Sequence, residues 1–247
     1  MDNWLLEQQM NQLLNVAEMQ DYAPNGLQVE GRREVRRVVT GVTACQALLD
    51  AALQAEADAI LVHHGYFWKN EAPTIRGMRR QRLKTLLAHD INLYAYHLPL
   101  DAHPQLGNNA QLARVLKITP QGLIAPLLPY GELAEPCSAG ELIGRLERKL
   151  HHSVLHCGDH APAKIRRVAW CSGGGQGFIE QAAQFGVDAF ITGEVSEQTI
   201  HIAREMGLHF FAAGHHATER GGIRALGEWL AREHGLEVTF IDIANPA

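Results

Sequence analysis

The strongest constraint on the fold of this chain is an internal repeat. Residues 35–64 (VRRVVTGVTACQALLDAALQAEADAILVHH) align without a gap with residues 165–194 (IRRVAWCSGGGQGFIEQAAQFGVDAFITGE). Identical positions include Arg36/Arg166, Arg37/Arg167, Val38/Val168, Gln46/Gln176, Asp58/Asp188 and Ala59/Ala189. Each copy reads as a short β run, a turn, an amphipathic helix and a second apolar β run, which is a βαβ unit. The repeat therefore predicts two α/β halves that are related by duplication and packed face to face.

A second pair of matching segments lies downstream of the first. Residues 91–101 align with residues 209–219, and both are apolar runs that end in a histidine followed four residues later by a carboxylate. These pairs are His97 with Asp101 and His215 with Glu219. We expect both pairs at equivalent strand ends, each followed by a helix.

Proline and glycine concentrate in residues 119–140 (TPQGLIAPLLPYGELAEPCSAG), which we interpret as a linker or domain entry. The boundary is placed near residue 125, with a first half over residues 1–125 and a second over 126–247, and elements of the two halves are free to interweave. A helix over residues 2–19 is expected to cover the first half, and the helical pattern ELIGRLERKL opens the second.

Composition narrows the class of protein. Apolar residues make up 46% of the 247 residues and charged residues 20%, the balance of a soluble globular protein. No apolar run approaches the roughly 18 residues needed to span a bilayer, and the acidic, amphipathic N-terminus is unlike a signal peptide. We therefore expect a cytoplasmic protein with no membrane partner. The four cysteines form no C-x-x-C pair, which argues against a disulfide framework or a thiolate zinc site.

Histidines occupy the first candidate site. His63 and His64 follow the apolar run of residues 59–62 directly and precede Gly65. Adjacent residues of a strand point to opposite faces, so the two rings cannot readily chelate one ion. At the C-terminal end of a strand, where open α/β sheets bind ligands, they could serve two neighbouring ions. The alternative is a hydrogen-bonded pair without a ligand.

The recurrence of His-x-x-x-carboxylate in both halves, with His-His at a third strand end, argues against coincidence. Imidazole nitrogens and carboxylate oxygens suit divalent transition-metal ions, and a shared carboxylate can bridge two ions about 3.5 to 4 Å apart. The sequence therefore predicts a two-metal site. Its candidate ligands are His63, His64, Asp101, His215 and Glu219.

Residues 151–160 (HHSVLHCGDH) form a rival cluster of metal-ligand types. Its spacing matches no closed tetrahedral zinc signature and it has no repeat partner, so we favour a solvated loop.

Residues 172–177 (SGGGQG) follow a β run and precede a helix. They form either a tight turn or a site for the phosphate of a substrate, although the dinucleotide and Walker patterns are both absent.

Five positive charges fall within residues 76–84, with no acid among them. We favour a solvated helix face, and contact with phosphate or nucleic acid is the alternative. The net charge of −5 gives no global attraction to nucleic acid. The neighbouring aromatic residues 66–68 are interpreted as an apolar wall of the metal site, with stacking on a base as the alternative.

Four motifs, HHGYFW, HLPLDAHPQLGNN, TGEVSEQTIH and AGHHATERGG, closely resemble those of the GTP cyclohydrolase 1 type 2 homologues, the NIF-like family. The resemblance runs from DYAPNGLQVEG to the closing FIDIANPA, nearly the whole chain. It implies a duplicated three-layer α/β/α architecture, a dinuclear metal site in the cleft between two similar halves, and a toroidal homohexamer. The family's ligands fall on the same five residues, with His97 near the site and His216 behind the metals.

The sequence and the resemblance together give a functional hypothesis. We expect a dinuclear metal-binding protein that acts as a cyclohydrolase-like, metal-dependent hydrolase on a nucleotide-like substrate, with two divalent ions of Zn, Fe, Mn, Ni or Co per chain. A water or hydroxide shared by the ions would be the nucleophile, and His97 is the candidate catalytic base. The alternative is a non-catalytic, metal-binding hexameric ring that binds nucleic acid or protein partners, in a role such as damage protection.

Overall fold

A computed structural model describes residues 1–247, and the chain divides into two compact units. Unit 1 consists of residues 1–107 and 222–244, and unit 2 of residues 108–221 and 245–247. This division differs from a single boundary near residue 125. Residues 108–116 pack into the core of unit 2, and the strand near the C-terminus completes the sheet of unit 1.

Unit 1 is built around a five-stranded sheet. Its strand order is β1 (Gly26–Val29), β4 (Asn92–Ala95), β3 (Ala59–His64), β2 (Arg37–Thr43) and β11 (Glu237–Phe240). Strands β4, β3, β2 and β11 are parallel, and β1 runs antiparallel at one edge. The helices are α1 (Asn3–Leu13), the 3-10 turn η1 (Val16–Glu18), α2 (Gln46–Gln54), α3 (Gly77–Ala88), α4 (Leu98–Ala102) and α9 (His215–His234), of which the residues from 222 onward belong to this unit.

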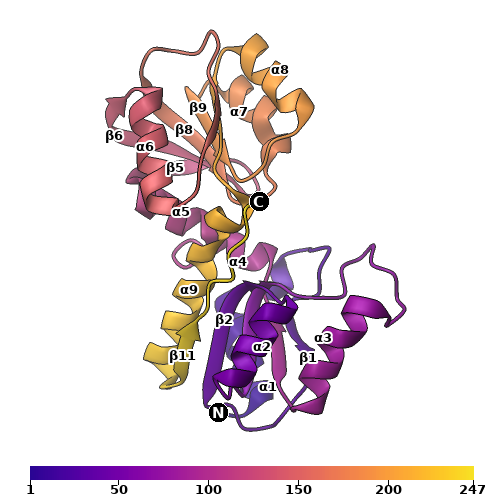
Figure 1. Ribbon diagram of the computed structural model, residues 1–247. Coiled ribbons are helices and arrows are strands. Elements are labelled where there is room, and N and C mark those ends of the chain that lie inside the picture. Colours follow the sequence, from indigo (N-terminus) through magenta and orange to yellow (C-terminus); the bar gives the residue numbers. More distant parts are fainter. The chain divides into compact units, whose positions relative to one another are not determined.

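Helices cover both faces of the sheet of unit 1 (Figure 1). Val38 and Val42 of β2 pack in one cluster with α1 and α9, whereas Val39 packs in another with α2 and α3. The strands are therefore apolar on both faces, as expected for a parallel sheet with helices on each side. The helix expected over residues 2–19 ends at Leu13, because Asn15 adopts a left-handed backbone conformation with φ of 50°.

Unit 2 has the same layered construction around a six-stranded sheet. Its strand order is β5 (Ile118–Ala125), β6 (Leu128–Cys137), β8 (Ile165–Cys171), β9 (Ala189–Thr192), β10 (His209–Ala212) and β7 (Leu155–Cys157). Helices α5 (Asn108–Leu116) and α6 (Ala139–Leu150) cover one face, and α7 (Ile179–Phe185) and α8 (Glu197–Met206) the other (Figure 1). Each unit is thus a three-layer α/β/α structure, as expected.

The segment interpreted as a linker is part of the sheet of unit 2, so that interpretation was wrong. Residues 118–137 form the antiparallel hairpin β5–β6, and β6 continues the sheet by pairing with β8. Leu128 and Leu133 are buried in the core. Pro120 lies in the edge strand β5. Proline has no backbone N–H to donate to a neighbouring strand, and an edge strand tolerates this loss because it has a neighbour on one side only. Proline content indicated a loop here, but an edge strand tolerates proline equally well.

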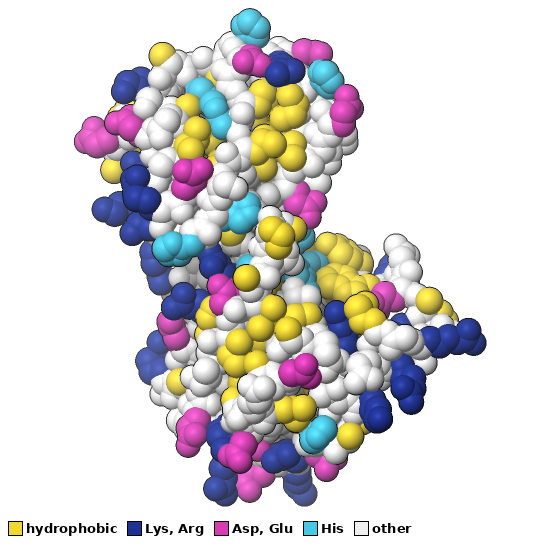
Figure 2. Space-filling view, viewed as in Figure 1, with side chains coloured by type: hydrophobic (Ala, Val, Ile, Leu, Met, Phe, Trp, Pro, Cys, Tyr) yellow, Lys and Arg dark blue, Asp and Glu magenta, His cyan; other side chains and the backbone are white.

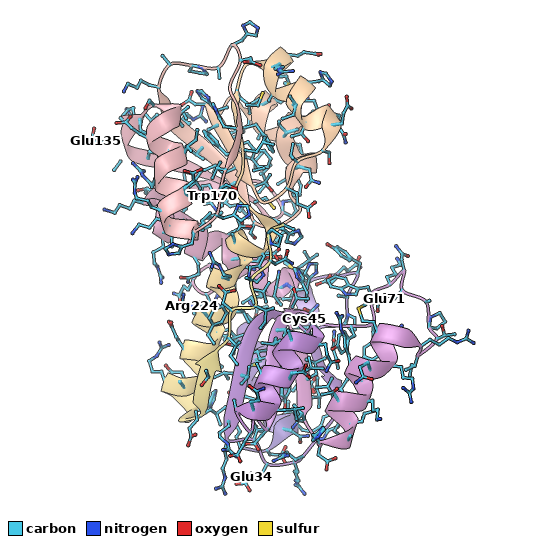
Figure 3. The ribbon with its side chains drawn as sticks, in the orientation of Figure 1. Glu34, Cys45, Glu71, Glu135, Trp170 and Arg224 are labelled. Carbon is cyan, nitrogen blue, oxygen red and sulfur yellow. The ribbon has the colours of Figure 1, made fainter.

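The core of unit 2 also receives the segment that precedes this hairpin. Trp170 of β8 is fully buried and donates its indole N–H to the backbone oxygen of Asn109 in α5, over 2.9 Å (Figure 3). The side chain of Asn109 in turn accepts the backbone N–H of Ser172, also at 2.9 Å. These bonds attach α5 to the end of β8.

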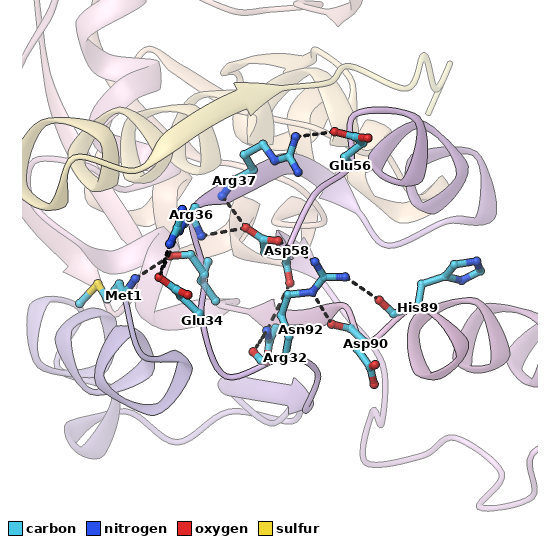
Figure 4. A network of polar contacts seen from close by, with 11 residues as sticks. Met1, Arg32, Glu34, Arg36, Arg37, Glu56, Asp58, His89, Asp90 and Asn92 are labelled. Atoms are coloured by element: carbon cyan, nitrogen blue, oxygen red, sulfur yellow. Dashed lines mark hydrogen bonds and ion pairs between the residues drawn. The ribbon is translucent and has the colours of Figure 1, made fainter.

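The repeat is visible in equivalent hydrogen bonds inside the two units. The carboxylate of Asp58 accepts the backbone N–H groups of Arg36 and Arg37, both at 2.9 Å (Figure 4). Asp188 accepts those of its counterparts, Arg166 and Arg167, both at 2.8 Å. The sheet registers also correspond, with Val38 opposite Ala59 in one unit and Val168 opposite Ala189 in the other. The aspartates therefore close the same βαβ unit twice.

The second pair of aligned segments does not occupy equivalent positions, and this corrects the sequence alignment. Val62 lies opposite Ala95 in unit 1, and Thr192, the counterpart of Val62, lies opposite Ala212 in unit 2. Counting on from these pairs, His97 corresponds to Gly214 and not to His215. The two His-x-x-x-carboxylate elements are therefore offset by one residue relative to their strands.

None of the helices combines the length and the apolar character that crossing a lipid bilayer requires.

Candidate metal centre

Three histidines gather at one edge of the sheet of unit 1. His63 and His64 are the last residues of β3, and His97 follows the neighbouring strand β4. One ligand nitrogen from each ring lies within 4.8 Å of the others. His63 is fully buried and His97 nearly so, whereas His64 is half-buried. Parallel strands bring their carboxyl ends to the same edge, which is why β3 and β4 deliver these side chains together.

A carboxylate joins the histidine cluster of unit 1. Asp101, on the short helix α4, is buried, and its Oδ1 lies 3.5 Å from Nε2 of His63. Two ligands that bind one Zn²⁺ ion at about 2.0 to 2.2 Å lie about 3.4 Å apart at the tetrahedral angle. The spacing between His63 and Asp101 therefore fits two ligands of a common ion.

Each of these histidines is held through its Nδ1 atom. Nδ1 of His63 lies 2.8 Å from the backbone oxygen of Tyr96, and Nδ1 of His64 lies 3.2 Å from Oγ1 of Thr43. Nδ1 of His97 lies 2.9 Å from a carboxylate oxygen of Asp21. Metal-binding histidines characteristically use one nitrogen for such a partner and the other for the ion. The arrangement selects Nε2 as the ligand atom of all three rings.

Asp21 has a central position beside His97. Besides His97, its carboxylate accepts the backbone N–H of Leu98 at 2.9 Å and the side-chain amide of Asn25 at 3.0 Å. Burial opposes the charge on Asp21, but the hydrogen bonds from His97 and Asn25 outweigh it and hold the pKa of this carboxyl well below its usual value. Asp21 is therefore ionised, and its negative charge favours a proton on Nδ1 of His97.

Unit 2 presents a histidine and a carboxylate on one helix face. His215 and Glu219 lie four residues apart at the start of α9, and His215 Nε2 lies 3.1 Å from Glu219 Oε2. Nδ1 of His215 lies 2.6 Å from Oε1 of Glu194. Burial disfavours the charged imidazole, but the carboxylates of Glu219 and Glu194 outweigh it and raise the pKa of His215 to about 9. A divalent ion held by Nε2 of His215 and by Glu219 would take the place of the proton between these two groups, and the proton on Nδ1 would stay with Glu194.

Glycines make room for the ligands of unit 2. A Cβ atom at Gly173 would lie 2.1 Å from Oε1 of Glu219 and 3.0 Å from Nε2 of His215, and Gly173 also has a φ of +66°. A Cβ atom at Gly193 would lie 2.6 Å from Cα of His215. Only glycine allows the ends of β8 and β9 to approach the first turn of α9 this closely.

Three backbone N–H groups of the glycine-rich turn after β8 form hydrogen bonds inside unit 2. The N–H of Gly173 donates to Oγ1 of Thr218 at 2.9 Å, and that of Gly175 donates to Oγ1 of Thr192 at 3.1 Å. The N–H of Ser172 is bonded to Asn109. Donors that are already satisfied are not offered to a phosphate. The bonded N–H groups of Ser172, Gly173 and Gly175 therefore favour a tight turn at this end of β8.

The rival histidine cluster does not assemble into one group of ligands. His156 lies 3.0 Å from His209, Asp159 pairs with Arg204 at 2.6 Å, and His152 lies 3.0 Å from the backbone oxygen of Pro246. Residues 155–157 form the edge strand β7. The segment is thus partly a strand of the sheet, and its polar side chains have separate partners.

The basic run occupies α3 and the residue before it. Arg76, Arg80 and Lys84 are exposed and follow one another at intervals of four residues, which places them on one helix face. Arg79 lies against the ring of Phe67, 5.0 Å from its centroid. Figure 2 shows dark blue side chains along the outer edge of unit 1 where α3 lies. Arg76, Arg80 and Lys84 thus form a solvated helix face, as expected, whereas Arg79 and Arg82 are half-buried.

The aromatic residues that follow His64 separate into two roles. Tyr66 is buried and donates its hydroxyl to the backbone oxygen of Ala44 at 2.8 Å, so it belongs to the core. Trp68 turns back toward the histidines, and its ring centroid lies 5.0 Å from that of His97 and 5.9 Å from that of His64. Trp68 therefore forms a wall of the cluster, as expected for this segment.

Sequence reasoning missed Asp21 and Glu194, the two carboxylates that hold His97 and His215. No spacing in the sequence points to Asp21, because it lies 76 residues from His97. A signal for Glu194 was present, since the repeat aligns it with His64. His216 is buried in the first turn of α9, and its backbone N–H lies 3.2 Å from the oxygen of Ala247.

Comparisons with known proteins agree over the whole chain. The family model described as Duf34/NIF3 (NGG1p interacting factor 3) matches residues 3–246. A GTP cyclohydrolase 1 type 2 homolog of Yersinia pestis is 71% identical over 247 residues, and one of Escherichia coli K12 is 67% identical, with all of each chain covered. The solved structure of "protein ybgI, unknown function" has a TM-score of 0.99 at 67% identity, and that of TTHA1606 from Thermus thermophilus has 0.93 at 34%, again with full coverage.

Proposed function

Because the chain belongs to the Duf34/NIF3 family, we propose that it is a dinuclear metal-binding protein that hydrolyses a nucleotide-like substrate. Two divalent transition-metal ions per chain, of Zn, Fe, Mn, Ni or Co, would be bound by ligands from both units. The proposed ligands are His63, His64, Asp101, His215 and Glu219. This assignment rests on the sequence motifs and on the geometry inside each unit.

One observation carries the proposal. Four histidines, two of them on β3, each have Nδ1 within 3.2 Å of an oxygen atom, and the four oxygens come from Tyr96, Thr43, Asp21 and Glu194. Nδ1 of His89 and of His152 also lies near an oxygen, so this contact alone does not mark a metal site. The four histidines differ because they also gather with other ligand groups: ligand nitrogens of His63, His64 and His97 lie within 4.8 Å of one another, and Nε2 of His215 lies 3.1 Å from Glu219. A common Nδ1 anchor is what a metal site needs, because it fixes the tautomer and the direction of Nε2.

The side chains of the chain divide the work of hydrolysis. Divalent ions, when bound, lower the pKa of a coordinated water from 15.7 toward about 7 and so supply a nucleophile at neutral pH. Asp101 and Glu219 contribute negative charge that offsets the charge of two dications. His97, with Nδ1 held by ionised Asp21, presents Nε2 as the atom that accepts and returns a proton. Asp21 thus acts on His97 as a positioning residue.

The sharpest test is Glu219→Gln, which keeps the size of the side chain and removes its charge. We expect the variant to lose at least one ion per chain and any hydrolytic activity, measured by elemental analysis and a substrate screen. Glu197→Gln is a matched control, because Glu197 also pairs with a histidine four residues away, His201, at 3.0 Å but on an exposed face. Retention of both ions by Glu219→Gln would contradict the ligand set.

The exposed face of α3 supports a second candidate, a metal-binding ring that binds nucleic acid. Its three cations would contact phosphates, so affinity for duplex DNA should fall steeply as salt rises. Replacing Arg76, Arg80 and Lys84 by Ala should weaken binding and flatten the salt slope by about 3. Equal binding by the variant and the unchanged protein would dismiss this function.

The ring is itself a proposal that rests on the family. We propose a homohexamer, in line with the closed symmetric assemblies common among soluble proteins. Light scattering of the purified protein should give a mass near six chains of 27.3 kDa. A stable monomer at micromolar concentration would contradict it.

A further inference from the structure

Two aromatic rings flank His97 on the surface of unit 1. Tyr22 exposes 53% of its surface, and Trp68 is half-buried. Their ring centroids lie 5.7 Å apart with the planes inclined by 35°, and each centroid lies 5.0 Å from that of His97. Both rings meet the imidazole at steep angles, 73° for Tyr22 and 81° for Trp68. The two rings therefore form one aromatic surface beside His97, here called the aromatic platform.

Three hydrogen bonds hold the platform in place. The backbone N–H of Lys69 donates to the backbone oxygen of Tyr22 at 2.8 Å, which joins the two segments that carry the rings. The indole N–H of Trp68 donates to the backbone oxygen of Gly65 at 3.2 Å. The backbone N–H of Trp68 donates to the carboxylate of Glu71 at 3.1 Å, in the loop before α3 (Figure 3). A surface held in this way needs little ordering when a ligand binds.

The backbone around Trp68 is also unusual. Phe67 has a φ of 64°, in the left-handed region that a bulky side chain occupies only when its surroundings require it. This residue reverses the chain between Tyr66, which is anchored in the core, and Trp68, which returns toward His64. The loop therefore adopts a strained conformation whose result is the position of the indole ring.

The placement of Tyr22 links the platform to the chemistry of the site. Asp21, its neighbour in sequence, holds Nδ1 of His97 and also accepts the backbone N–H of Tyr22 at 2.7 Å. One two-residue segment thus orients the candidate base and presents a ring beside it. A planar ring that stacks on Tyr22 or Trp68 is therefore held close to the candidate base, because each of the two ring centroids lies 5.0 Å from that of His97.

We propose that the aromatic platform of Tyr22 and Trp68 binds the planar heteroaromatic ring of the substrate by stacking. The inference rests on the proposed function and names the part of the substrate that unit 1 recognises. Stacking accepts any flat π-system, and each stacked base contributes about 1–3 kcal/mol, equivalent to about a 5- to 150-fold change in affinity.

Nucleosides without a phosphate are suitable probes, because their binding does not depend on anion contacts. Guanosine, adenosine, cytidine and uridine are titrated by calorimetry into the protein as purified and after chelation, with ribose 5-phosphate as the non-aromatic probe. We expect at least one nucleoside to bind with Kd below about 1 mM with or without metal. Ribose 5-phosphate should not bind to the chelated protein.

Substitutions of the rings test the platform directly. Tyr22→Leu and Trp68→Leu should each raise the Kd of that nucleoside by about 5- to 150-fold, whereas Tyr22→Phe should leave it within about twofold, because the π face remains. Trp4→Leu is the matched control: Trp4 is 54% exposed in the same unit and bonded to Glu30. Tyr22 is on the surface, so its substitution leaves the core intact.

Elemental analysis of every variant separates this inference from the proposed function. Unchanged metal content with weakened nucleoside binding supports the platform, and loss of ions in the Glu219→Gln test bears only on the metal centre. The platform is overturned if no nucleoside binds, if Tyr22→Leu and Trp68→Leu bind as well as the unchanged protein, or if Trp4→Leu weakens binding equally.

Discussion

The ends of two corresponding strands show how the units differ. Strand β3 of unit 1 ends in His63 and His64, and the repeat aligns these positions with Gly193 and Glu194, which follow β9 in unit 2. The hydrogen bonds and registers that lead up to these residues correspond closely. The two strands therefore differ at these last two positions, at the end of the strand where an α/β fold places its ligand sites.

The same two positions serve different purposes. In unit 1 they carry imidazoles that are themselves candidate ligands. In unit 2 the glycine admits the backbone of His215, and the glutamate bonds to its ring over 2.6 Å. The candidate ligand of unit 2 lies instead on α9, the helix after β10, and the end of β9 supports it. One scaffold can thus offer ligands from a strand or from a helix. Which of the two it offers depends on whether the residue at the end of the strand has a large side chain or is a glycine.

The largest effect is expected from filling the space that unit 2 keeps open. Gly173→Ala would place a Cβ atom 2.1 Å from Oε1 of Glu219, at a backbone angle that favours glycine. We expect loss of at least one ion per chain, measured by elemental analysis after reloading. Gly177→Ala, four residues along the same turn, has no atom within 4 Å of the added carbon and should keep both ions. Full metal content in Gly173→Ala would show that the close approach is not needed.

A smaller effect is expected when Glu194, the residue that supports His215, keeps its size but loses its charge. Glu194→Gln should lower the affinity of the ion bound by His215 by about 10- to 100-fold, the usual range for a carboxylate behind a metal-binding histidine. Competition with a chelator of known affinity measures the change. Gln176→Ala serves as the control. The side-chain amide of Gln176 donates to Oε2 of Glu194 at 3.3 Å, whereas His215 contacts the other carboxylate oxygen, Oε1. An unchanged affinity in Glu194→Gln would deny that this residue supports the site.

The βαβ units themselves should respond alike. Asp58→Asn and Asp188→Asn each replace a carboxylate that accepts two backbone N–H groups, and we expect each to destabilise its unit by about 1–3 kcal/mol in chemical denaturation. Burial disfavours the charge on Asp58, but the N–H groups of Arg37 and Arg36 lower its pKa in the folded protein.

The lowered pKa gives this prediction a pH dependence with a defined sign. The stabilisation by Asp58 is complete above the unfolded pKa of about 3.9 and is lost as the pH falls through the lower folded value. The unchanged protein and Asp58→Asn should therefore converge in stability on strong acidification. A gap that stays constant down to low pH would mean that the charge of Asp58 contributes nothing.

The smallest effect is expected in unit 1, where the support of His64 is a hydroxyl. Thr43→Val keeps the shape of the side chain and removes the contact with Nδ1 of His64 at 3.2 Å. A neutral hydrogen bond contributes about 0.5–1.5 kcal/mol, so metal affinity should fall by about 2- to 12-fold. If Thr43→Val weakened binding more than Glu194→Gln, the contrast between the hydroxyl and the carboxylate would be reversed.

The sequence predicted the parts of this molecule that are periodic or repeated. Both βαβ units, and the position of His63 and His64 at a strand end, follow from residues 35–64 and their copy. The edge hairpin of residues 118–137 was misread because proline is compatible with a loop and with an edge strand. The one-residue offset between His97 and His215 was not predicted, because a four-residue spacing carries no information about strand register. Asp21 could not be found, since only folding brings it to His97.

The edge strand β5 has a consequence for how copies of this chain can associate. An open sheet edge offers unpaired backbone groups on which another chain can template a further strand. In β5, Pro120 removes one donor, and the pairing with β6 shifts register twice, so the edge is neither regular nor flat. Growth of this sheet from molecule to molecule is thereby discouraged. Association at this edge would then depend on side-chain surfaces, which discriminate between partners in a way that a bare backbone edge cannot.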